Sequence, residues 1–348
     1  MGGFSIGDLN IGGNSTFVIA EAGSNHNGDL DRALSLVEAA ADAGADAVKF
    51  QTFRADSLYV EDSGEVEYLT DDRSIYKIVS EMEMPYEWIP TLHEHCDDND
   101  VLFMSTPFDE RSADELEPYV PAFKVASYTM THHPFLRYLA GKDLPLVVST
   151  GAHDLSEVAE SVSVLRTAGG SEFALLQCVA AYPTPLDSIN VRVVETLADE
   201  FGVPTGLSDH TADPVVAPSA AVALGASVVE KHFTMDKTLE GPDHQFALEP
   251  DELERMVGAI RATESVLGSG RKEVLDVEAE LHAVARRAVH ATAHIERGER
   301  LTKQNIAVLR SGRQERGLAP KHFEDLVGRK ATRTIHKSEG ITWDDVDE

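Results

Sequence analysis

The stretch FVIAEAGSNHNGDLDRALSLVEAAADAGADAVKFQ, residues 17–51, decides the fold of this chain. It begins with a short apolar run, FVIAE, and ends with another, DAVKFQ, and both runs are typical of buried strands. Between them, DRALSLVEAAADAG carries apolar residues on one helical face, and Gly44 supplies the signal that ends a helix. The stretch therefore predicts a strand, a helix and a second, parallel strand.

The same pattern recurs along most of the chain. Seven of the intervals between the apolar runs are helical in pattern, and eight parallel strands close a (β/α)8 barrel. An open, doubly wound sheet is the alternative. The eight runs occupy residues 17–21, 46–51, 101–106, 123–127, 146–151, 173–178, 203–210 and 227–232.

The chain divides into three predicted parts. We expect an α/β fold, a TIM barrel that forms the catalytic domain, over residues 1–270, because strand and helix patterns alternate there. The segment GSGRKEV signals a linker, which we place at residues 271–284. Short alternating runs and the turn signal ERGER predict a small, mostly β module over residues 285–348.

The composition favours a globular protein. Hydrophobic residues make up 42% of the 348 residues, which is enough for a large core. No stretch approaches the roughly 20 apolar residues of a membrane span, and the N-terminus lacks the pattern of a signal peptide. We therefore expect a cytoplasmic protein. The two cysteines, Cys96 and Cys178, lie far apart, which argues against a disulfide or a thiolate metal site.

The net charge is strongly negative, with 60 acidic and 30 basic residues. Such a field repels nucleic acid and anionic membranes, so neither is an expected partner. A salt-rich, halophilic cytoplasm, in which ions screen this charge, is the simplest setting. The charge is uneven, because the residues from Arg286 onward hold 13 basic and 10 acidic side chains, a net charge of +3.

Polar side chains gather at the C-terminal ends of the predicted strands. In a barrel these ends form one face, and active sites assemble on that face. Lysine and histidine are uncommon at strand ends, so chance placement explains the whole set poorly. The residues are Glu21, Lys49, Gln51, Thr106, Lys124, Ser127, Ser149, Gln177, Ser208, His210, Lys231 and His232.

Two histidines end neighbouring predicted strands, His210 on the seventh and His232 on the eighth. Two imidazoles with nearby carboxylates predict an open divalent-metal site for Mn²⁺, Fe²⁺, Co²⁺ or Zn²⁺. A hydrogen-bonding or core role for either histidine is the alternative. The candidate carboxylates are Glu21, Asp209, Glu230 and Asp243.

Three lysines, Lys49, Lys124 and Lys231, are predicted to reach the same opening of the barrel, at the C-terminal ends of its strands. Buried ammonium groups need a partner, so we expect a multiply charged anion with a phosphate and a carboxylate. A Schiff-base aldolase, or an ion pair of Lys231 with Glu230, is the alternative. The loop residues 25–27 (Asn-His-Asn) suit a sugar, or else cap the helix that follows Asp29.

Motifs in order along nearly the whole chain resemble those of the sialic acid synthases. The segment RRAVHATAHIERGERLTKQNIAVLRSG is similar to that family's C-terminal antifreeze-protein-like module, the SAF domain. The other motifs are IAEAGSNHNGDLDRALSLVEAAADAGADAVKFQTF, STPFD, KVASYTMTHHPFL, STGAHD, QCVAAYPTP, GLSDHT, VVEKHFTMD and GPDH.

The resemblance implies a transferase. Such an enzyme condenses phosphoenolpyruvate with N-acetylmannosamine, releases phosphate and forms N-acetylneuraminate. A legionaminic or pseudaminic acid synthase, acting on a 2,4-diacetamido-trideoxyhexose, is one alternative. A non-catalytic sugar-binding protein of surface-polymer assembly is another.

The resemblance also assigns roles to residues of this chain. It implies that His210 and His232 hold a divalent metal, Mn²⁺ or Mg²⁺. Glu21 or Asp243 would transfer protons beside Lys49 and Lys124, and Ser208 is a further substrate-binding candidate. The residues that match the phosphoenolpyruvate site are Lys49, Thr106, Lys124, Ser127 and Ser149, and those that match the sugar site are Glu21, Gln51, Tyr182 and Asp243.

A homodimer is implied in which the SAF domain covers the partner's barrel, a domain-swapped arrangement. Arg310 matches best the arginine that this domain contributes to the sugar. The sequence SGRQERG follows it where the family has Pro-Gly, so Arg313 and Arg316 remain candidates. Ala180 stands where bacterial members that use N-acetylmannosamine have asparagine, which leaves the sugar open.

Overall fold

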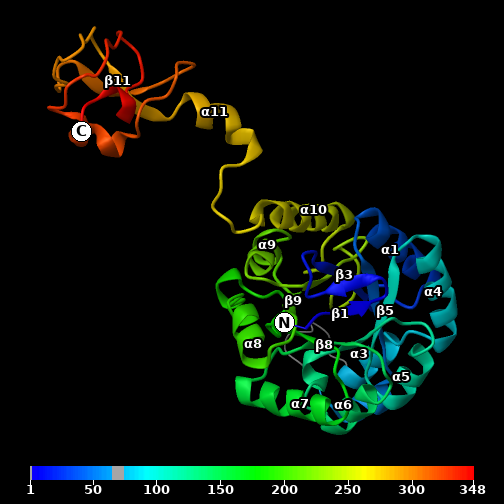
Figure 1. Cartoon of the computed structure of the whole chain (residues 1–348). Helices are drawn as coiled ribbons and strands as arrows, with labels where there is room; N and C mark the ends of the chain where they lie inside the picture. The colour runs from blue at the N-terminus through cyan, green and yellow to red at the C-terminus, as the bar shows by residue number, and fades with distance from the viewer. Residues whose placement is uncertain (1, 65–73) are drawn as a thin grey trace. The chain divides into compact units, whose positions relative to one another are not determined.

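The computed structural model describes residues 2–64 and 74–348 and divides into two compact units, Met1–Gly268 and Ser269–Glu348 (Figure 1). The family resemblance and the alternating pattern predicted a barrel followed by a small module, and this fold is confirmed. The predicted linker, residues 271–284, contains short elements of its own, η4 (Asp276–Glu278) and α11 (Ala279–Val284).

Within the described residues, eight parallel strands close the barrel in the order β10-β3-β4-β5-β6-β7-β8-β9. Each strand pairs with the next one along the chain, and β10 pairs with β3 to complete the circle. The strands are β3 (Phe17–Gly23), β4 (Ala47–Thr52), β5 (Leu102–Pro107), β6 (Phe123–Val125), β7 (Leu146–Ser149), β8 (Phe173–Cys178), β9 (Thr205–Asp209) and β10 (Val228–His232).

Helices cover the outside of this barrel (Figure 1). Helix α1 begins after Asp29, whose carboxylate accepts a hydrogen bond from the Arg32 backbone N–H. It ends at Asp42, and Gly44, with φ of +77°, turns the chain away two residues later. The helices are α1 (Leu30–Asp42), α2 (Ala55–Leu58), α3 (Ile75–Glu81), α4 (Ile89–Asp98), α5 (Glu110–Leu116), α6 (His133–Ala140), α7 (Leu155–Thr167), α8 (Val193–Phe201), α9 (Val216–Ala223) and α10 (Pro250–Leu267), with 3-10 turns η1 (Tyr86–Trp88), η2 (Ser127–Thr129) and η3 (Leu186–Ser188).

Alternate residues of each strand face opposite sides of the barrel wall. In β10, Val228 packs in the barrel interior, whereas Val229 packs in the layer between strands and helices. The interior cluster also contains Phe4, Ile6 and Ile11 from the hairpin of β1 (Phe4–Ile6) and β2 (Leu9–Ile11). This hairpin therefore fills the N-terminal end of the barrel and leaves polar side chains at the other end.

The second unit is built around the antiparallel pair β11 (Arg287–Ala291) and β12 (Ile306–Arg310). Its own core includes Val289, Ile295 and Ile341. Gly317 permits a close backbone crossing, because a Cβ atom there would lie 2.1 Å from the Val289 carbonyl oxygen. The remaining elements are η5 (Pro320–His322), α12 (Phe323–Leu326) and η6 (Trp343–Asp345). In the described part of the chain, no helix is long and apolar enough to cross a membrane.

Candidate active site

A buried ion pair lies at the C-terminal end of the barrel strands. The Lys49 Nζ atom is 2.7 Å from Glu21 Oε2 and 2.9 Å from Thr106 Oγ1. These inward-facing side chains come from β3, β4 and β5, which are adjacent in the barrel. The sequence placed these three residues in one site, and the structure brings them together.

A second lysine shares a carboxylate with the first. Lys124 Nζ donates to Ser149 Oγ at 2.7 Å and lies 3.8 Å from Glu230 Oε1. The other Glu230 oxygen is 3.8 Å from Lys49 Nζ, and Ser208 donates to Glu230 at 3.2 Å. Glu230 thus lies between two ammonium groups, at the position where an anionic ligand would balance the same charges.

The two buried carboxylates of this cluster have opposite pKa shifts. Burial raises the pKa of Glu21 to about 7, although Lys49 acts in the other direction. Burial would also raise the pKa of Glu230, but Lys124 and Lys49 outweigh it and hold the pKa below its ordinary value. Burial lowers the pKa of Lys124. Carboxylates whose pKa values are driven apart in this way suit proton transfer and charge balance, respectively.

The two histidines face each other beside this cluster, with ring centroids 5.5 Å apart. His210 Nδ1 lies 2.9 Å from the Val179 carbonyl oxygen, to which it can donate, and this leaves Nε2 to face the pocket. His232 Nδ1 is buried without a hydrogen-bond partner, 3.6 Å from Asp243 Oδ2. The ring of Tyr182 lies 4.3 Å from that of His210.

These residues fit a divalent metal with two imidazole ligands. Burial lowers the pKa of His232 well below its ordinary range, so the ring stays neutral, which is the form that binds metal. Within the described residues, no group of three or more His, Cys, Asp or Glu side chains forms a metal site. Water or substrate would therefore supply the remaining ligands, as in open catalytic sites.

A polar recess surrounds Gly23 near the histidines. Gln51 donates to Glu21 Oε1 at 2.9 Å. A Cβ atom at Gly23 would lie 3.5 Å from both Gln51 Nε2 and Asp243 Oδ2, and the residue has φ of +54°. Loss of solvent raises the pKa of Asp243 to about 6. The recess places three of the residues predicted for the sugar around one small volume.

Cys178 is a pocket residue that sequence reasoning missed. Its Sγ lies 3.8 Å from His210 Nδ1. Burial opposes charge on both groups, yet their contact raises the pKa of His210 and lowers that of Cys178. Since Leu176 faces the barrel interior, the alternation along β8 could have placed Cys178 inward as well.

Lys231 does not enter the pocket, and the prediction that it reaches the mouth is wrong. It follows the inward Glu230 on β10, so its side chain leaves the other face of the barrel wall. There it pairs with Asp209, which is excluded from the pocket for the same reason. Gln177 also lies outside the pocket lining and donates to the Ile189 carbonyl.

The asparagines of the loop after β3 bind the backbone of the chain itself. Asn25 donates to the Phe233 carbonyl, and Asn27 donates to the Glu240 carbonyl. His26 is fully buried against Trp88, and burial lowers its pKa to about 4. The suggested sugar-binding role of residues 25–27 is therefore wrong, because these contacts fix the loop to the segment that follows β10.

One cavity joins the two lysines, the histidine pair and Tyr182. Its lining also brings in Ser127, whose Oγ accepts the Gly151 backbone N–H at 3.0 Å. The lining residues are Glu21, Lys49, Gln51, Thr106, Phe108, Lys124, Ala126, Ser127, Tyr128, Ser149, Cys178, Tyr182, Ser208, His210, Glu230 and His232. Most of the barrel residues predicted to bind substrate or metal line this cavity, Asp243 lies beside it at 3.6 Å from His232, and Lys231 and Asp209 lie outside it.

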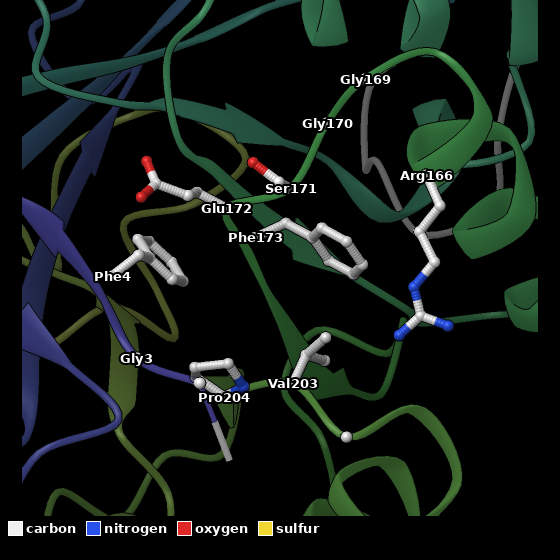
Figure 2. Close-up of a pocket in the computed structure, with 12 residues that line it drawn as sticks. Gly3, Phe4, Arg166, Gly169, Gly170, Ser171, Glu172, Phe173, Val203 and Pro204 are labelled. Carbon is white, nitrogen blue, oxygen red and sulfur yellow. The ribbon is translucent and has the colours of Figure 1, made fainter.

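A larger cavity of about 560 Å³ lies near the N-terminal ends of β8 and β9. Figure 2 shows Arg166 and Glu172 on opposite sides of the Phe173 ring. Arg166 already donates to the Phe201 carbonyl. Because the predicted chemical groups are absent from its lining, this cavity is not the candidate site.

The SAF-like unit presents its arginines at the end of the β11–β12 pair. Arg310 is directly opposite Arg287 in the strand register. The loop that follows is held by Ser311, whose hydroxyl is 2.8 Å from His290 Nε2. Arg313 and Arg316 lie in that loop, and all three candidate arginines stay in one segment.

Residues 36–272 match the model of the NeuB family, and residues 286–347 match that of the SAF domain. The chain belongs to the NeuB family. The resemblance to sialic acid synthases is thereby confirmed at the level of a NeuB-family, phosphoenolpyruvate-dependent nonulosonic acid synthase. The NeuB match covers most of the barrel and ends four residues beyond it, at residue 272, and the SAF match lies within the second unit.

Relatives of this NeuB-family chain extend over nearly its whole length. It is 44% identical to the spore coat polysaccharide biosynthesis protein SpsE of Bacillus subtilis, over 99% of this chain and 98% of the relative. It is 38% identical to the N,N'-diacetyllegionaminic acid synthase of Legionella pneumophila, over 95% and 94%. It is 36% identical to a pseudaminic acid synthase of Campylobacter jejuni, over 97% and 98%.

Solved structures of NeuB-like proteins share this fold. The crystal structure of SpsE from Bacillus subtilis matches with a TM-score of 0.68 and 43% identity, over 100% of this chain and 99% of that one. The sialic acid synthetase of Leptospira borgpetersenii, solved with citrate, matches with a TM-score of 0.72 and 33% identity, over 80% and 94%.

Proposed function

We propose that this chain condenses phosphoenolpyruvate with the open-chain aldehyde of an acetamido sugar: a carbon–carbon bond forms between them, one water molecule adds to the former enol carbon, and the phosphate ester is cleaved to release inorganic phosphate. N-acetylmannosamine, which gives N-acetylneuraminate, is the first candidate sugar. The observation that carries the proposal is the placement of Lys49 and Lys124 beside the His210–His232 pair in one cavity. Two ammonium groups suit an anion that carries both a phosphate and a carboxylate. The adjacent imidazoles suit a metal ion that would polarise the sugar carbonyl.

The two lysines bind the anion. Lys49 and Lys124 neutralise the phosphate and the carboxylate, and the hydroxyls of Thr106, Ser127 and Ser149 fix its orientation. Orientation of this kind lowers the barrier because the reacting carbons are held together before reaction. Glu230, between the lysines, keeps their charge balanced when the anion leaves.

The histidine pair would hold a divalent metal, Mn²⁺ or Mg²⁺, with the ring nitrogens of His210 and His232. A metal there supplies Lewis-acid polarisation of the sugar carbonyl. Tyr182 and Phe246 pack against these rings and hold them in place. Gln51 and Asp243 flank the recess at Gly23 and orient the sugar hydroxyls.

Glu21 is the preferred proton-transfer residue. Its pKa of about 7 lets the carboxyl group both hold and release a proton near neutral pH. Asp243, with a pKa of about 6, is the second choice. Glu21 contacts Lys49 and Gln51, so it borders both the anion and the sugar positions.

A second sugar class is supported by Ala180. Where bacterial users of N-acetylmannosamine have an asparagine amide, this chain has a methyl group. The loss of an amide partner favours a less hydroxylated sugar such as a 2,4-diacetamido-trideoxyhexose. Two of the relatives reported above are named as an N,N'-diacetyllegionaminic acid synthase and a pseudaminic acid synthase, which agrees with this alternative.

We also propose a homodimer in which the SAF domain of one protomer covers the barrel of the other. Exposed aliphatic side chains lie in the last turn of α10 and in the segment after it, where an isolated chain would leave them in water. They are Val266, Leu267, Val274, Leu275, Val277 and Leu281. Arg310 would then contribute to the sugar site of the partner, with Arg313 and Arg316 as alternatives.

Phosphate release from phosphoenolpyruvate tests the proposal. The sugars are N-acetylmannosamine and 2,4-diacetamido-trideoxyhexoses, each assayed with EDTA and with added Mn²⁺. We expect release that depends on the sugar, stops in EDTA and returns with Mn²⁺. Full turnover in EDTA would contradict the metal role.

Two further results identify the alternatives. Borohydride trapping of a substrate on a lysine would indicate a Schiff-base aldolase. Tight sugar binding without phosphate release from any sugar would indicate a non-catalytic binding protein.

A further inference from the structure

A buried ion pair lies on the outer side of the barrel wall, directly behind the two histidines. Lys231 Nζ is 2.5 Å from Asp209 Oδ2, and the two side chains are 1% and 0% exposed. Lys231 and Asp209 are direct partners in the parallel pairing of β10 with β9. The next residues along these strands are His232 and His210, so the pair immediately precedes both histidines.

The lysine also holds the far side of His210. Its Nζ donates to the Thr211 carbonyl oxygen at 2.5 Å. Asp209 accepts the Thr211 backbone N–H at 2.9 Å and the Thr211 hydroxyl at 3.1 Å. One ammonium group therefore binds the residue before His210 and the residue after it. The same lysine is also the residue immediately before His232 in the sequence.

Stability alone does not require charges at this position. Leu207 and Val229, which face the same outer layer on the same strands, are buried apolar residues. Apolar residues of similar volume are often at least as stabilising as a buried ion pair, whereas a pair with directed hydrogen bonds fixes geometry. The cluster of Lys231, Asp209 and Thr211 is thus better explained by what it positions.

We propose that Lys231, Asp209 and Thr211 form a positioning cluster that sets the separation of His210 and His232 and thereby the affinity for a divalent metal. This inference rests on the proposed metal role of the histidines. The cluster does not touch the anion site, since Lys49 and Lys124 contact Glu21, Glu230, Thr106 and Ser149 inside the barrel.

Mn²⁺ binding to the full-length protein, followed by electron paramagnetic resonance, tests the inference. Lys231→Met should weaken Mn²⁺ binding by about tenfold or more, the loss typical when a group that orients a metal ligand is removed. Calorimetric binding of phosphoenolpyruvate without metal should be unchanged. A purely structural role would change both affinities or neither. A lower affinity for Mn²⁺ with an unchanged affinity for phosphoenolpyruvate is therefore the decisive result.

Lys142→Met is the matched control. Lys142 pairs with Asp114 at 2.6 Å and with Glu117 at 2.8 Å in the same unit, at the ends of α5 and α6 and away from β9 and β10. It should leave Mn²⁺ affinity unchanged. If Lys231→Met does not fold, Asp209→Asn provides the same comparison, because it keeps the side-chain size and an oxygen that can accept the Thr211 N–H.

The outcomes separate this inference from the proposed function. A folded Lys231→Met protein that binds Mn²⁺ as tightly as the parent overturns the positioning role and leaves the metal site intact. A parent that binds no Mn²⁺, or a His210→Ala/His232→Ala protein that binds it as tightly as the parent, overturns the metal site and the positioning role together.

Discussion

Lys49 Nζ lies 2.7 Å from Glu21 Oε2 inside the barrel, with the two side chains 2% and 1% exposed. The lysine that would bind the substrate anion is therefore paired with the carboxyl group that would transfer the proton. Binding of an anion at Lys49 would weaken the ion pair between Lys49 and Glu21. We therefore expect anion binding to change the proton affinity of Glu21.

Loss of the Lys49 ammonium group should weaken the anion site. In Lys49→Met we expect the affinity for phosphoenolpyruvate to fall about 100-fold, as for one charge-assisted contact worth about 3 kcal/mol. Calorimetric titration measures this affinity. Lys142→Met, which removes an ion pair with Asp114 and Glu117, is the control and should bind as the parent does. Parent-like affinity in a folded Lys49→Met protein would contradict the anion role.

Glu21 should make stability depend on pH. Its pKa is about 7 in the folded protein against an ordinary 4.5, so folding favours the protonated form. The stabilising contribution is complete below about pH 4.5 and is lost as the pH rises through about 7.

Glu21→Gln removes this titration. The difference in melting temperature between about pH 5 and about pH 8 should become smaller than in the parent. Glu87→Gln, at an exposed position, should keep the parent's profile. The same profile in Glu21→Gln and the parent would show that Glu21 does not titrate in this range.

Removal of one imidazole should abolish the activity that depends on a bound metal. His232→Ala is expected to lose activity, and added Mn²⁺ should not restore it, because His210 alone binds a divalent ion weakly. Circular dichroism checks that the fold is intact. Unfolding of the variant would instead favour a structural role for this histidine, and rescue by Mn²⁺ would place the metal elsewhere.

The SAF domain should affect the sugar and not the anion. Arg310→Ala should raise the KM for the sugar about 100-fold, the loss expected for one charge-assisted contact, with phosphoenolpyruvate affinity unchanged. Arg313→Ala and Arg316→Ala identify the arginine if Arg310 is not the one. Arg297→Ala, at an exposed turn, is the control. A chain that ends at Gly268 and keeps full activity would refute the role of the domain.

Salt should stabilise the protein. The net charge of −30 produces repulsion that mobile ions screen over about 3 Å at about 1 M salt. The melting temperature should therefore rise with KCl. A melting temperature that stays constant up to molar KCl would count against adaptation to a salt-rich cytoplasm.

Much of this architecture could be predicted from local patterns. The eight apolar runs became the eight strands, because a buried parallel strand needs continuous apolar residues whatever its neighbours are. Most of the polar residues at the strand ends line one cavity, since closure of the barrel brings all those ends to one face. Both results follow from periodicity and topology alone.

The errors concern contacts between distant segments. Asn25 and Asn27 bind carbonyl groups more than 200 residues away, at Phe233 and Glu240, and no local signal indicates such partners. Lys231 was grouped with Lys49 by residue type. The two-residue alternation of β10 excludes it, because Glu230 and His232 face the pocket and the residue between them cannot.

The hairpin of β1 and β2 bears on the order in which the two proposed substrates bind. Since Phe4, Ile6 and Ile11 fill one end of the barrel, a substrate of the proposed reaction would enter, and its product would leave, through the opposite end. Lys49 is 2% exposed, whereas Tyr182, on the sugar side, is 39% exposed. If the sugar binds at Tyr182, the closed end of the barrel leaves the lysines no second entrance, so we expect the anion to bind before the sugar.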